Sequence, residues 1–221
     1  MPTPYPAPAQ AAGAEPGVRR VVWDATAGDG KGRLNLPYSS WLWHSTCGRA
    51  PLAVLYEQKG PTVSLEETIA TQLRARGWHL ALAETTTGGI IAVRLVRLAG
   101  SSAYFDRSIV AYSKEAKVQS LGVDPAVFER SGAVSVATAC AMAEGLQRLT
   151  HADIVLAETG IAGPIRGRSP KPLGSTCFAM HTPTGMVTDD VQFDGGERQA
   201  IQEQIAEHAL EMIARYLTTA A

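Results

Sequence analysis

The sequence predicts a three-layer α/β/α sandwich built on a mixed sheet, and three observations point to this fold class. From about residue 62 onward, short apolar runs typical of buried strands alternate with segments of helical periodicity, as in α/β proteins. Runs at 175–180 and 186–193 flank a turn sequence at 182–185, which predicts a hairpin and therefore antiparallel pairing late in the chain. Loops rich in glycine and hydroxyl side chains follow two of the apolar runs, as at the carboxyl edge of an open sheet.

The first predicted helix has signals at both of its ends. Ser64 and Glu67 have the spacing of a capping box, and Gly77 ends the helix. The other elements that we expect are strands at 78–83, 108–112, 153–157, 175–180 and 186–193, and helices at 90–96, 113–121, 135–149 and 197–217. The last helix carries a stripe of apolar residues that predicts its buried face, namely Ile201, Ile205, Ala209, Met212, Ile213 and Tyr216.

The amino-acid composition divides the chain near residue 62. Residues 1–17 are rich in proline and alanine, bury little apolar surface and are predicted to be disordered. Residues 18–62 hold three of the 4 tryptophans but show little periodicity. We therefore expect a partly disordered N-terminal extension at 1–62 and one functional domain at 63–221.

The charge balance and the cysteines argue against several classes of function. Lys and Arg number 20 and Asp and Glu 21, for a net charge of −1, which argues against nucleic acid or a membrane as partner. The 3 cysteines are widely spaced, which predicts neither a zinc site nor a disulfide framework and suits a reducing compartment. No apolar run approaches about 18 residues, and no signal peptide is visible. We expect a cytoplasmic protein that acts on a small molecule.

The loop at 85–89 follows a predicted strand and holds three threonines and two glycines. A hydroxyl such as that of Thr85 can act as a nucleophile at this junction if a base lies nearby. The amides of Thr87, Gly88 and Gly89, at the start of the next helix, could then hold a developing oxyanion. The alternative is a structural N-cap, because threonine before two glycines begins a helix in any case.

A tyrosine ends the next predicted strand, and two lysines follow at the start of the next helix. Lys117, if buried beside a hydroxyl, can lose its proton and serve as a general base. Tyr112, at the strand end, can relay a proton or orient a substrate. The alternative is a solvated helix start, with both lysines of this segment in water.

The second glycine-rich loop, at 158–164, adds the Thr159 hydroxyl and the amides of Gly160 and Gly163. A basic segment follows at 165–172, and cations beside a glycine loop suit a phosphate-bearing ligand. The alternative is an exposed loop without a ligand. The two loops together predict one site assembled from two strand ends.

The segment from about Leu82 to Tyr216 resembles the C-terminal domain of the competence/damage-inducible protein CinA. That domain also occurs alone as the nicotinamide-nucleotide amidase, or NMN deamidase. The matching motifs follow the family's order and spacing over about 135 residues, and they lie at 83–89, 99–105, 112–117, 121–125, 132–135, 159–164 and 171–174. Residues 1–62 lie outside the resemblance.

The resemblance implies an amidohydrolase that converts nicotinamide mononucleotide (NMN) to nicotinic acid mononucleotide and ammonia. The family uses a serine nucleophile and a lysine base, and needs neither metal nor cofactor. Carried over position by position, Thr85 takes the nucleophile's place, Lys117 is the base and Tyr112 stands beside it. Thr159 matches a threonine of the second loop, and Arg198 matches an arginine that meets the ligand phosphate. We expect a homo-oligomer with a nucleotide substrate and without a nucleic-acid or membrane partner.

This chain departs from the family at positions that bear on activity. In the family pattern Glu-Ser-Cys-Thr-Gly-Gly, Thr85 replaces the serine and Thr86 the cysteine, while Lys114 replaces the asparagine of Tyr-Ser-Asn. The β-methyl of threonine restricts χ1 and crowds an attacking hydroxyl. Two alternatives to an amidase therefore stay open. One is a pyridine-nucleotide-binding protein with impaired catalysis, and the other is an interaction protein connected with competence or DNA damage.

Overall fold

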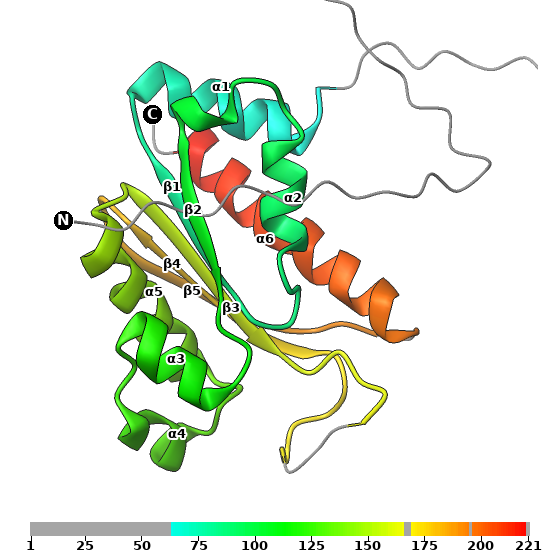
Figure 1. Cartoon of the computed structure of the whole chain (residues 1–221). Helices are drawn as coiled ribbons and strands as arrows, with labels where there is room; N and C mark the ends of the chain where they lie inside the picture. The colour runs from blue at the N-terminus through cyan, green and yellow to red at the C-terminus, as the bar shows by residue number, and fades with distance from the viewer. Residues whose placement is uncertain (1–62, 166–168, 195, 220–221) are drawn as a thin grey trace, which may run out of the picture. The chain divides into compact units, whose positions relative to one another are not determined.

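The structure is a computed structural model that describes residues 63–165, 169–194 and 196–219 (Figure 1). The predicted extension at 1–62, and Arg166 and Arg168 of the basic segment, lie outside the described residues. The elements, in chain order, are α1 (Leu65–Arg76), β1 (Leu80–Glu84), α2 (Ile90–Val96), a 3-10 turn (Ser101–Ala103), β2 (Phe105–Val110), α3 (Lys114–Leu121), α4 (Pro125–Ser131), α5 (Val136–Thr150), β3 (Ile154–Gly160), β4 (Ser175–Thr182), β5 (Gly185–Gln192) and α6 (Arg198–Thr219).

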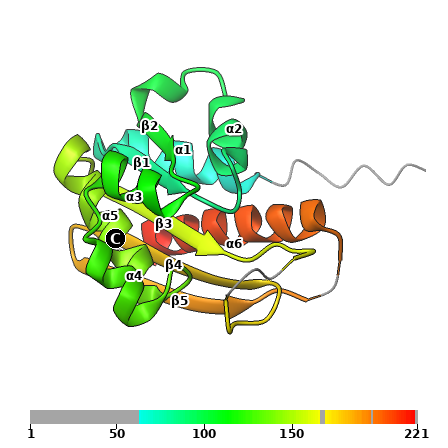
Figure 2. The same ribbon diagram turned by 60° about the horizontal axis from the view of Figure 1, so that its bottom comes forward.

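The sheet has five strands in the order β2-β1-β3-β4-β5. Strand β1 pairs in parallel with β2 and β3, whereas β4 pairs antiparallel with both β3 and β5. Helices α1, α2 and α6 cover one face of the sheet, and α3, α4 and α5 cover the other (Figure 1, Figure 2). The predicted three-layer α/β/α sandwich with a mixed sheet is therefore confirmed.

Alternate residues of the central strands belong to different cores. Leu80 and Leu82 of β1 lie in the core with α1, α2 and α6, whereas Ala81 and Ala83 lie in the core with α3, α4 and α5. The same alternation continues to the end of the strand, so that the Glu84 carboxylate meets the start of α2. The next side chain, Thr85, turns to the opposite side of the sheet, where α3 begins.

Helix ends follow the signals in the sequence. Ser64 N donates to Glu67 Oε2 at 2.9 Å and Glu67 N donates to Ser64 Oγ at 3.2 Å, which confirms the predicted capping box. Gly77 ends α1 with φ 63°, a conformation that glycine adopts without strain. In the same way Ser113 caps α3 and Gly122 ends it.

Two strands differ from the prediction at their ends. The sequence predicts a strand at 108–112, but β2 ends at Val110 because the carbonyls of Ala111 and Tyr112 turn towards Lys117. The sequence also predicts that the third strand ends at residue 157, but β3 continues to Gly160. It does so because β4 supplies partners for the last residues, with Thr159 opposite Cys177.

Helix α4 is absent from the predicted elements. Asp124 caps it by accepting a hydrogen bond from Ala126 N at 2.9 Å, and Pro125 occupies its first turn. An Asp–Pro pair is a recognised start signal for a helix. With only 7 residues, however, α4 is too short to show a helical period in the sequence.

Candidate active site

A cavity of about 620 Å³ lies at the carboxyl ends of β1 and β3. Its walls come from the loop after β1, the loop between β2 and α3, the end of β3 and the start of α6. The structure therefore brings together most of the predicted site residues, namely Thr85, Tyr112, Lys117, Thr159, Gly160, Gly163 and Arg198. Thr86, Lys114 and Lys171 also line the cavity.

Thr85 and Lys117 meet at one backbone oxygen. Thr85 Oγ1 donates to Ala111 O at 3.1 Å, and Lys117 Nζ donates to the same oxygen at 2.9 Å. Lys117 Nζ also donates to Tyr112 O at 3.2 Å. The hydroxyl and the amine are thus neighbours around a single acceptor, in the wall of the cavity.

Burial prepares Lys117 to act as a base. Its side chain is only 2% exposed, and this burial lowers its pKa from 10.5 to about 8, against the opposing attraction of Glu158. A neutral amine has two hydrogens and one lone pair. Because two carbonyls take the two hydrogens, the lone pair remains to accept a proton from a neighbouring hydroxyl.

Arg198 closes one side of the cavity from the first residue of α6. Its Nη1 donates to Gly163 O at 2.8 Å and its Nη2 donates to the Tyr112 hydroxyl at 3.1 Å. Arg198 thereby links the loop after β3 to the loop after β2. Tyr112 itself is 62% exposed, so its ring can meet a ligand at the rim of the cavity.

Thr159 and Gly160 shape the wall contributed by β3. Thr159 Oγ1 donates to Ala133 O at 2.9 Å, which ties the strand to the loop before α5. An added Cβ on Gly160 would lie 2.5 Å from Thr176 Oγ1 of the neighbouring strand, so only glycine fits there. These two residues therefore have clear structural roles in addition to the binding role that we predict for them.

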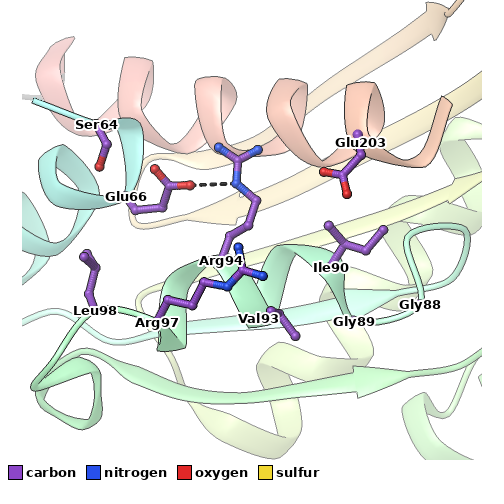
Figure 3. A pocket seen from close by; sticks show the side chains of 10 residues that line it. All are labelled: Ser64, Glu66, Gly88, Gly89, Ile90, Val93, Arg94, Arg97, Leu98 and Glu203. Atoms are coloured by element: carbon purple, nitrogen blue, oxygen red, sulfur yellow. Dashed lines mark hydrogen bonds and ion pairs between the residues drawn. The ribbon is translucent and has the colours of Figure 1, made fainter. Parts of the chain in front are cut away.

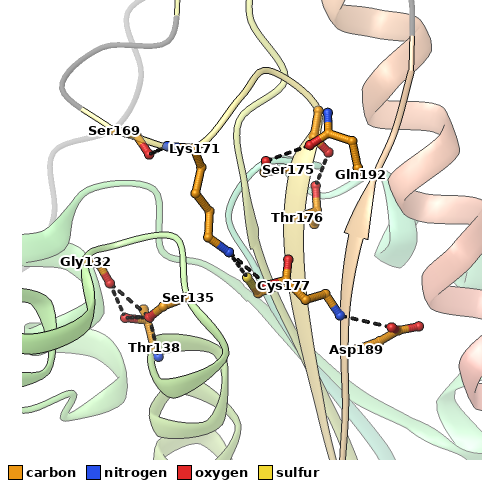
Figure 4. Close-up of polar contacts among 12 residues, drawn as sticks. Gly132, Ser135, Thr138, Ser169, Lys171, Ser175, Thr176, Cys177, Asp189 and Gln192 are labelled. Carbon is orange, nitrogen blue, oxygen red and sulfur yellow. Dashed lines mark hydrogen bonds and ion pairs between the residues drawn. The ribbon is translucent and has the colours of Figure 1, made fainter.

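The cavity has a cationic lining. Lys171 enters from the loop before β4, and its Nζ donates to Asp190 Oδ2 at 2.9 Å and contacts Cys177 Sγ at 3.3 Å (Figure 4). Lys114 extends over the Phe128 ring, with its Nζ 5.7 Å from the ring centre. With Arg198 these make three cationic side chains beside Lys117, and no carboxylate belongs to the described lining. Such a lining favours an anionic ligand.

The predicted oxyanion role of Thr87, Gly88 and Gly89 needs correction. Thr87 N donates to Glu158 Oε1 at 2.9 Å and Gly89 N donates to Glu84 Oε2 at 2.8 Å, so neither amide is available to a substrate. Gly88 and Gly89 line a different cavity, of about 470 Å³, between α1, α2 and α6 (Figure 3). Arg94 crosses that cavity and is already paired with Glu66 and Glu207.

Two buried glutamates hold the loop at 85–89 and are absent from the predicted site. Glu84 accepts hydrogen bonds from the amides of Gly89, Ile91 and Ala92 at the start of α2. Glu158 accepts hydrogen bonds from the amides of Thr85 and Thr87. The sequence does carry a signal, since each glutamate directly follows an apolar strand whose alternation directs it into the core.

The described ranges contain neither a cluster suited to a metal ion nor a helix suited to cross a membrane. Within 63–165, 169–194 and 196–219, no group of three or more His, Cys, Asp or Glu side chains is placed to hold a metal ion. Within the same ranges, no helix has both the length and the apolar character needed to cross a bilayer.

Comparison with known proteins places these features in a family. The family model of the CinA C-terminal domain matches residues 62–217. A CinA-like protein of Syntrophobacter fumaroxidans is 43% identical over 154 residues, which cover 70% of this chain and 36% of that protein. A CinA-like protein of Geobacter sulfurreducens is 43% identical over 157 residues, covering 71% of this chain and 38% of that protein. The chain thus matches well under half the length of these relatives.

Solved structures agree with this match. A CinA superfamily protein from Klebsiella pneumoniae superposes with a TM-score of 0.67 and 34% identity, over 70% of this chain and 96% of that one. The competence/damage inducible protein CihA from Agrobacterium tumefaciens superposes with a TM-score of 0.66 and 36% identity, over 70% of this chain and 93% of that one.

Proposed function

The chain belongs to the CinA C-terminal domain family, and from this membership and the geometry around Thr85 we propose that it is a nicotinamide-nucleotide amidase. The proposed reaction is hydrolysis of the carboxamide of NMN to nicotinic acid mononucleotide and ammonia. One observation carries the proposal: Thr85 Oγ1 and Lys117 Nζ share the acceptor Ala111 O in the wall of a cationic cavity.

The proposed chemistry has two steps. Neutral Lys117 takes the proton of Thr85 as the threonine oxygen bonds to the carboxamide carbon. When the tetrahedral intermediate collapses, the C–N bond breaks and Lys117 returns the proton, so that ammonia leaves and an ester remains on Thr85. Lys117, neutral again, then takes a proton from a water molecule as the water oxygen bonds to the ester carbon. The bond from that carbon to Thr85 Oγ1 breaks, Lys117 returns the proton to Thr85, and nicotinic acid mononucleotide leaves.

The tetrahedral intermediate needs a donor for its oxyanion. Because the amides of Thr87 and Gly89 already donate to carboxylates, the amide of Thr86 is the better candidate. Thr86 directly follows the proposed nucleophile and lines the cavity. The amide of the residue after a nucleophile supplies this contact in other hydrolases that carry the nucleophile on a strand-to-helix turn.

The cationic lining supports a phosphate-bearing substrate. Arg198 lies between the two loops that form the site, where its guanidinium can turn from Gly163 O and Tyr112 towards a phosphate. Lys114 and Lys171 add positive charge to the same cavity. A charge-assisted contact of this kind fixes one end of the nucleotide and presents its other end to the nucleophile.

The test is release of ammonia from NMN by the full chain and its variants. Thr85→Ala should abolish the activity, and Lys117→Ala should lower it by about 10²–10⁴-fold, the usual contribution of a general base. Thr85→Ser should raise it, because it removes the methyl group that crowds the attack. The double variant Thr85→Ala, Lys117→Ala should be no worse than Thr85→Ala alone, since the two groups act as a unit.

Thr188→Ala is the matched control, because Thr188 is an exposed threonine of β5, away from the cavity lining. It should keep the wild-type rate. Wild-type activity in Thr85→Ala would refute Thr85 as nucleophile. An inactive wild type that still binds NMN, with activity appearing in Thr85→Ser, would identify a nucleotide-binding relative whose catalysis is lost at this residue.

A further inference from the structure

Two carboxyl groups lie buried under the proposed nucleophile. Glu84 is the last residue of β1, Glu158 directly follows the Ala157 that pairs with Ala83, and both glutamates are 0% exposed. The Thr87 hydroxyl lies between them, with its Oγ1 2.8 Å from Glu84 Oε2 and 2.8 Å from Glu158 Oε1. Two carboxyl groups therefore meet at one hydroxyl, away from solvent.

One threonine hydroxyl cannot donate to both carboxyl groups at once. A threonine hydroxyl has one hydrogen and can donate it to only one of the two glutamates at a time. Two ionised carboxylates at this separation, without exposure to water, would repel each other strongly, so one of them stays protonated.

The remaining contacts assign the proton to Glu158. Glu84 accepts from three backbone amides at the start of α2 and from Ser108 Oγ at 2.8 Å, and these donors stabilise its charge. Glu158 accepts only at Oε1, from the amides of Thr85 at 2.6 Å and Thr87 at 2.9 Å. Its Oε2 is buried without a hydrogen-bond partner among the described residues.

The Thr86 hydroxyl can accept a hydrogen bond from the protonated carboxyl group of Glu158. Thr86 Oγ1 is likewise buried without a hydrogen-bond partner in the described part of the chain. Burial raises the pKa of Glu158, against the opposing effect of the hydrogen bonds that it accepts from Thr87 and from the amide of Thr85. A hydrogen bond donated by a protonated Oε2 to Thr86 Oγ1 would satisfy both orphaned atoms.

We propose that Glu158, in its protonated form, is a positioning residue that fixes Thr85 for attack while keeping a negative charge away from Lys117. This inference rests on the proposed function. Glu158 acts through the amides on both sides of Thr86, which set the path of the loop that carries the nucleophile. An ionised Glu158 raises the pKa of Lys117 and so lowers the share of the amine that is neutral and able to serve as a base.

The groups around Glu158 are consistent with this role. Glu84 faces it from β1 through Thr87, and Lys117 faces it from α3. Phe178 lies opposite on β4. From α6, Gln202 donates to Thr86 O at 2.7 Å and contributes no charge.

The test compares Glu158→Gln with Glu158→Leu and with Glu84→Gln. Glutamine mimics a protonated glutamate, since its carbonyl can accept from the two amides while its NH₂ faces Thr86. Glu158→Gln should therefore keep kcat for NMN within about threefold and should leave the pH profile of kcat unchanged. Glu158→Leu should lower kcat by about 10²-fold or more with little change in KM, because the nucleophile loses its support.

Glu84→Gln is the matched control, because it removes the charge from the other buried carboxyl. It should lower the midpoint of denaturant unfolding, whereas Glu158→Gln should not. A Glu158→Gln variant as impaired or as unstable as Glu158→Leu would overturn the proposal. Wild-type kcat in Glu158→Leu would overturn it as well.

An infrared measurement separates this proposal from the amidase proposal. The wild type should show the C=O band of a protonated carboxyl group at neutral pH, and Glu158→Gln should lose that band. If the wild type releases no ammonia but the band is present and Glu158→Gln is stable, the proposed function fails while the protonated Glu158 stands. If the band is missing, the proposal about Glu158 fails whatever the activity.

Discussion

At the scale of single residues, the carbonyl of Ala111 organises the site. Ala111 directly follows β2 and its amide donates to Glu84 O of β1 at 2.9 Å, while its carbonyl accepts from both Thr85 Oγ1 and Lys117 Nζ. A backbone oxygen held by a sheet moves little, so it positions both reactive groups without help from a further side chain. A side-chain substitution cannot remove this backbone acceptor. We therefore expect substitutions of Thr85 and Lys117 themselves to lower the activity most.

The lowered pKa of Lys117 predicts a pH dependence of the rate. Below about pH 8 the amine is protonated, so kcat/KM for NMN should rise about tenfold per pH unit and level off above pH 8. A rate that is flat between pH 6 and 9 would show that Lys117 is not the base.

The same group predicts a pH dependence of stability. Between about pH 8 and the ordinary value of 10.5, the unfolded chain binds a proton that the folded chain does not. The free energy of unfolding should therefore rise with pH through this window, as the cost of burying a charged amine disappears. Lys117→Met should remove the rise, and denaturant unfolding at a series of pH values measures it.

Arg198 predicts selectivity for the phosphate of the substrate. Arg198→Ala should weaken binding of NMN by about 1.5–3 kcal/mol and leave binding of nicotinamide riboside, which lacks the phosphate, unchanged. Calorimetry on both ligands measures the difference. Arg215→Ala, an exposed arginine of the same helix, is the control. Equal affinities of the wild type for NMN and the riboside would remove the phosphate from the proposed function.

At the scale of elements, the sequence best predicts those helix and strand ends that depend only on contacts between residues close in the chain. The capping box of α1 and the glycines after α1 and α3 depend on contacts within a few residues, and the structure confirms them. The ends of β2 and β3 depend on partners far along the chain. The carbonyl of Ala111, just beyond β2, accepts from Lys117 Nζ and does not continue the strand. Strand β3 extends to Gly160 because β4 pairs with its last residues. A window of local sequence therefore predicts neither strand end.

The candidate site likewise contains features that local sequence predicts and features that depend on distant partners. The two loops and Lys117 are predictable because glycine and hydroxyl residues after apolar runs indicate a strand end, and the structure brings them to one cavity. Local sequence does not predict which groups accept hydrogen bonds from the loop amides. Whether the amide of Thr87 faces a substrate or Glu158 depends on a strand 71 residues away.

Helix α5 offers a test of packing between elements. Gly145 lies where α5 passes the end of α3, and an added Cβ would overlap the carbonyl oxygen of Leu121. Gly145→Ala should therefore destabilise the protein by about 1–3 kcal/mol, although alanine is the better helix former. Glu144→Ala, at the neighbouring exposed position, should change stability little. Thermal unfolding compares the two, and a stabilised Gly145→Ala would contradict this packing.

At the scale of the whole molecule, the described residues contain two cores on the two faces of one sheet. The family match also begins at residue 62. We therefore predict that a chain beginning at Thr62 folds by itself, with a cooperative unfolding transition at the same denaturant midpoint as the full chain. A soluble full chain together with an insoluble or molten shortened one would show that residues 1–62 contribute to the core.

The contacts of the site span very different lengths of chain. Lys117 and Ala111 are 6 residues apart and Thr85 and Ala111 are 26 apart, whereas Arg198 and Tyr112 are 86 apart. Closing a longer loop costs more conformational entropy, and long-range contacts slow folding. The contacts of Thr85 and Lys117 with Ala111 O therefore cost less loop-closure entropy than the contact that Arg198 makes with Tyr112. Detaching the start of α6 would therefore break the long-range contacts of Arg198 and open the cavity, while the shorter-range contacts at Ala111 O would stay in place.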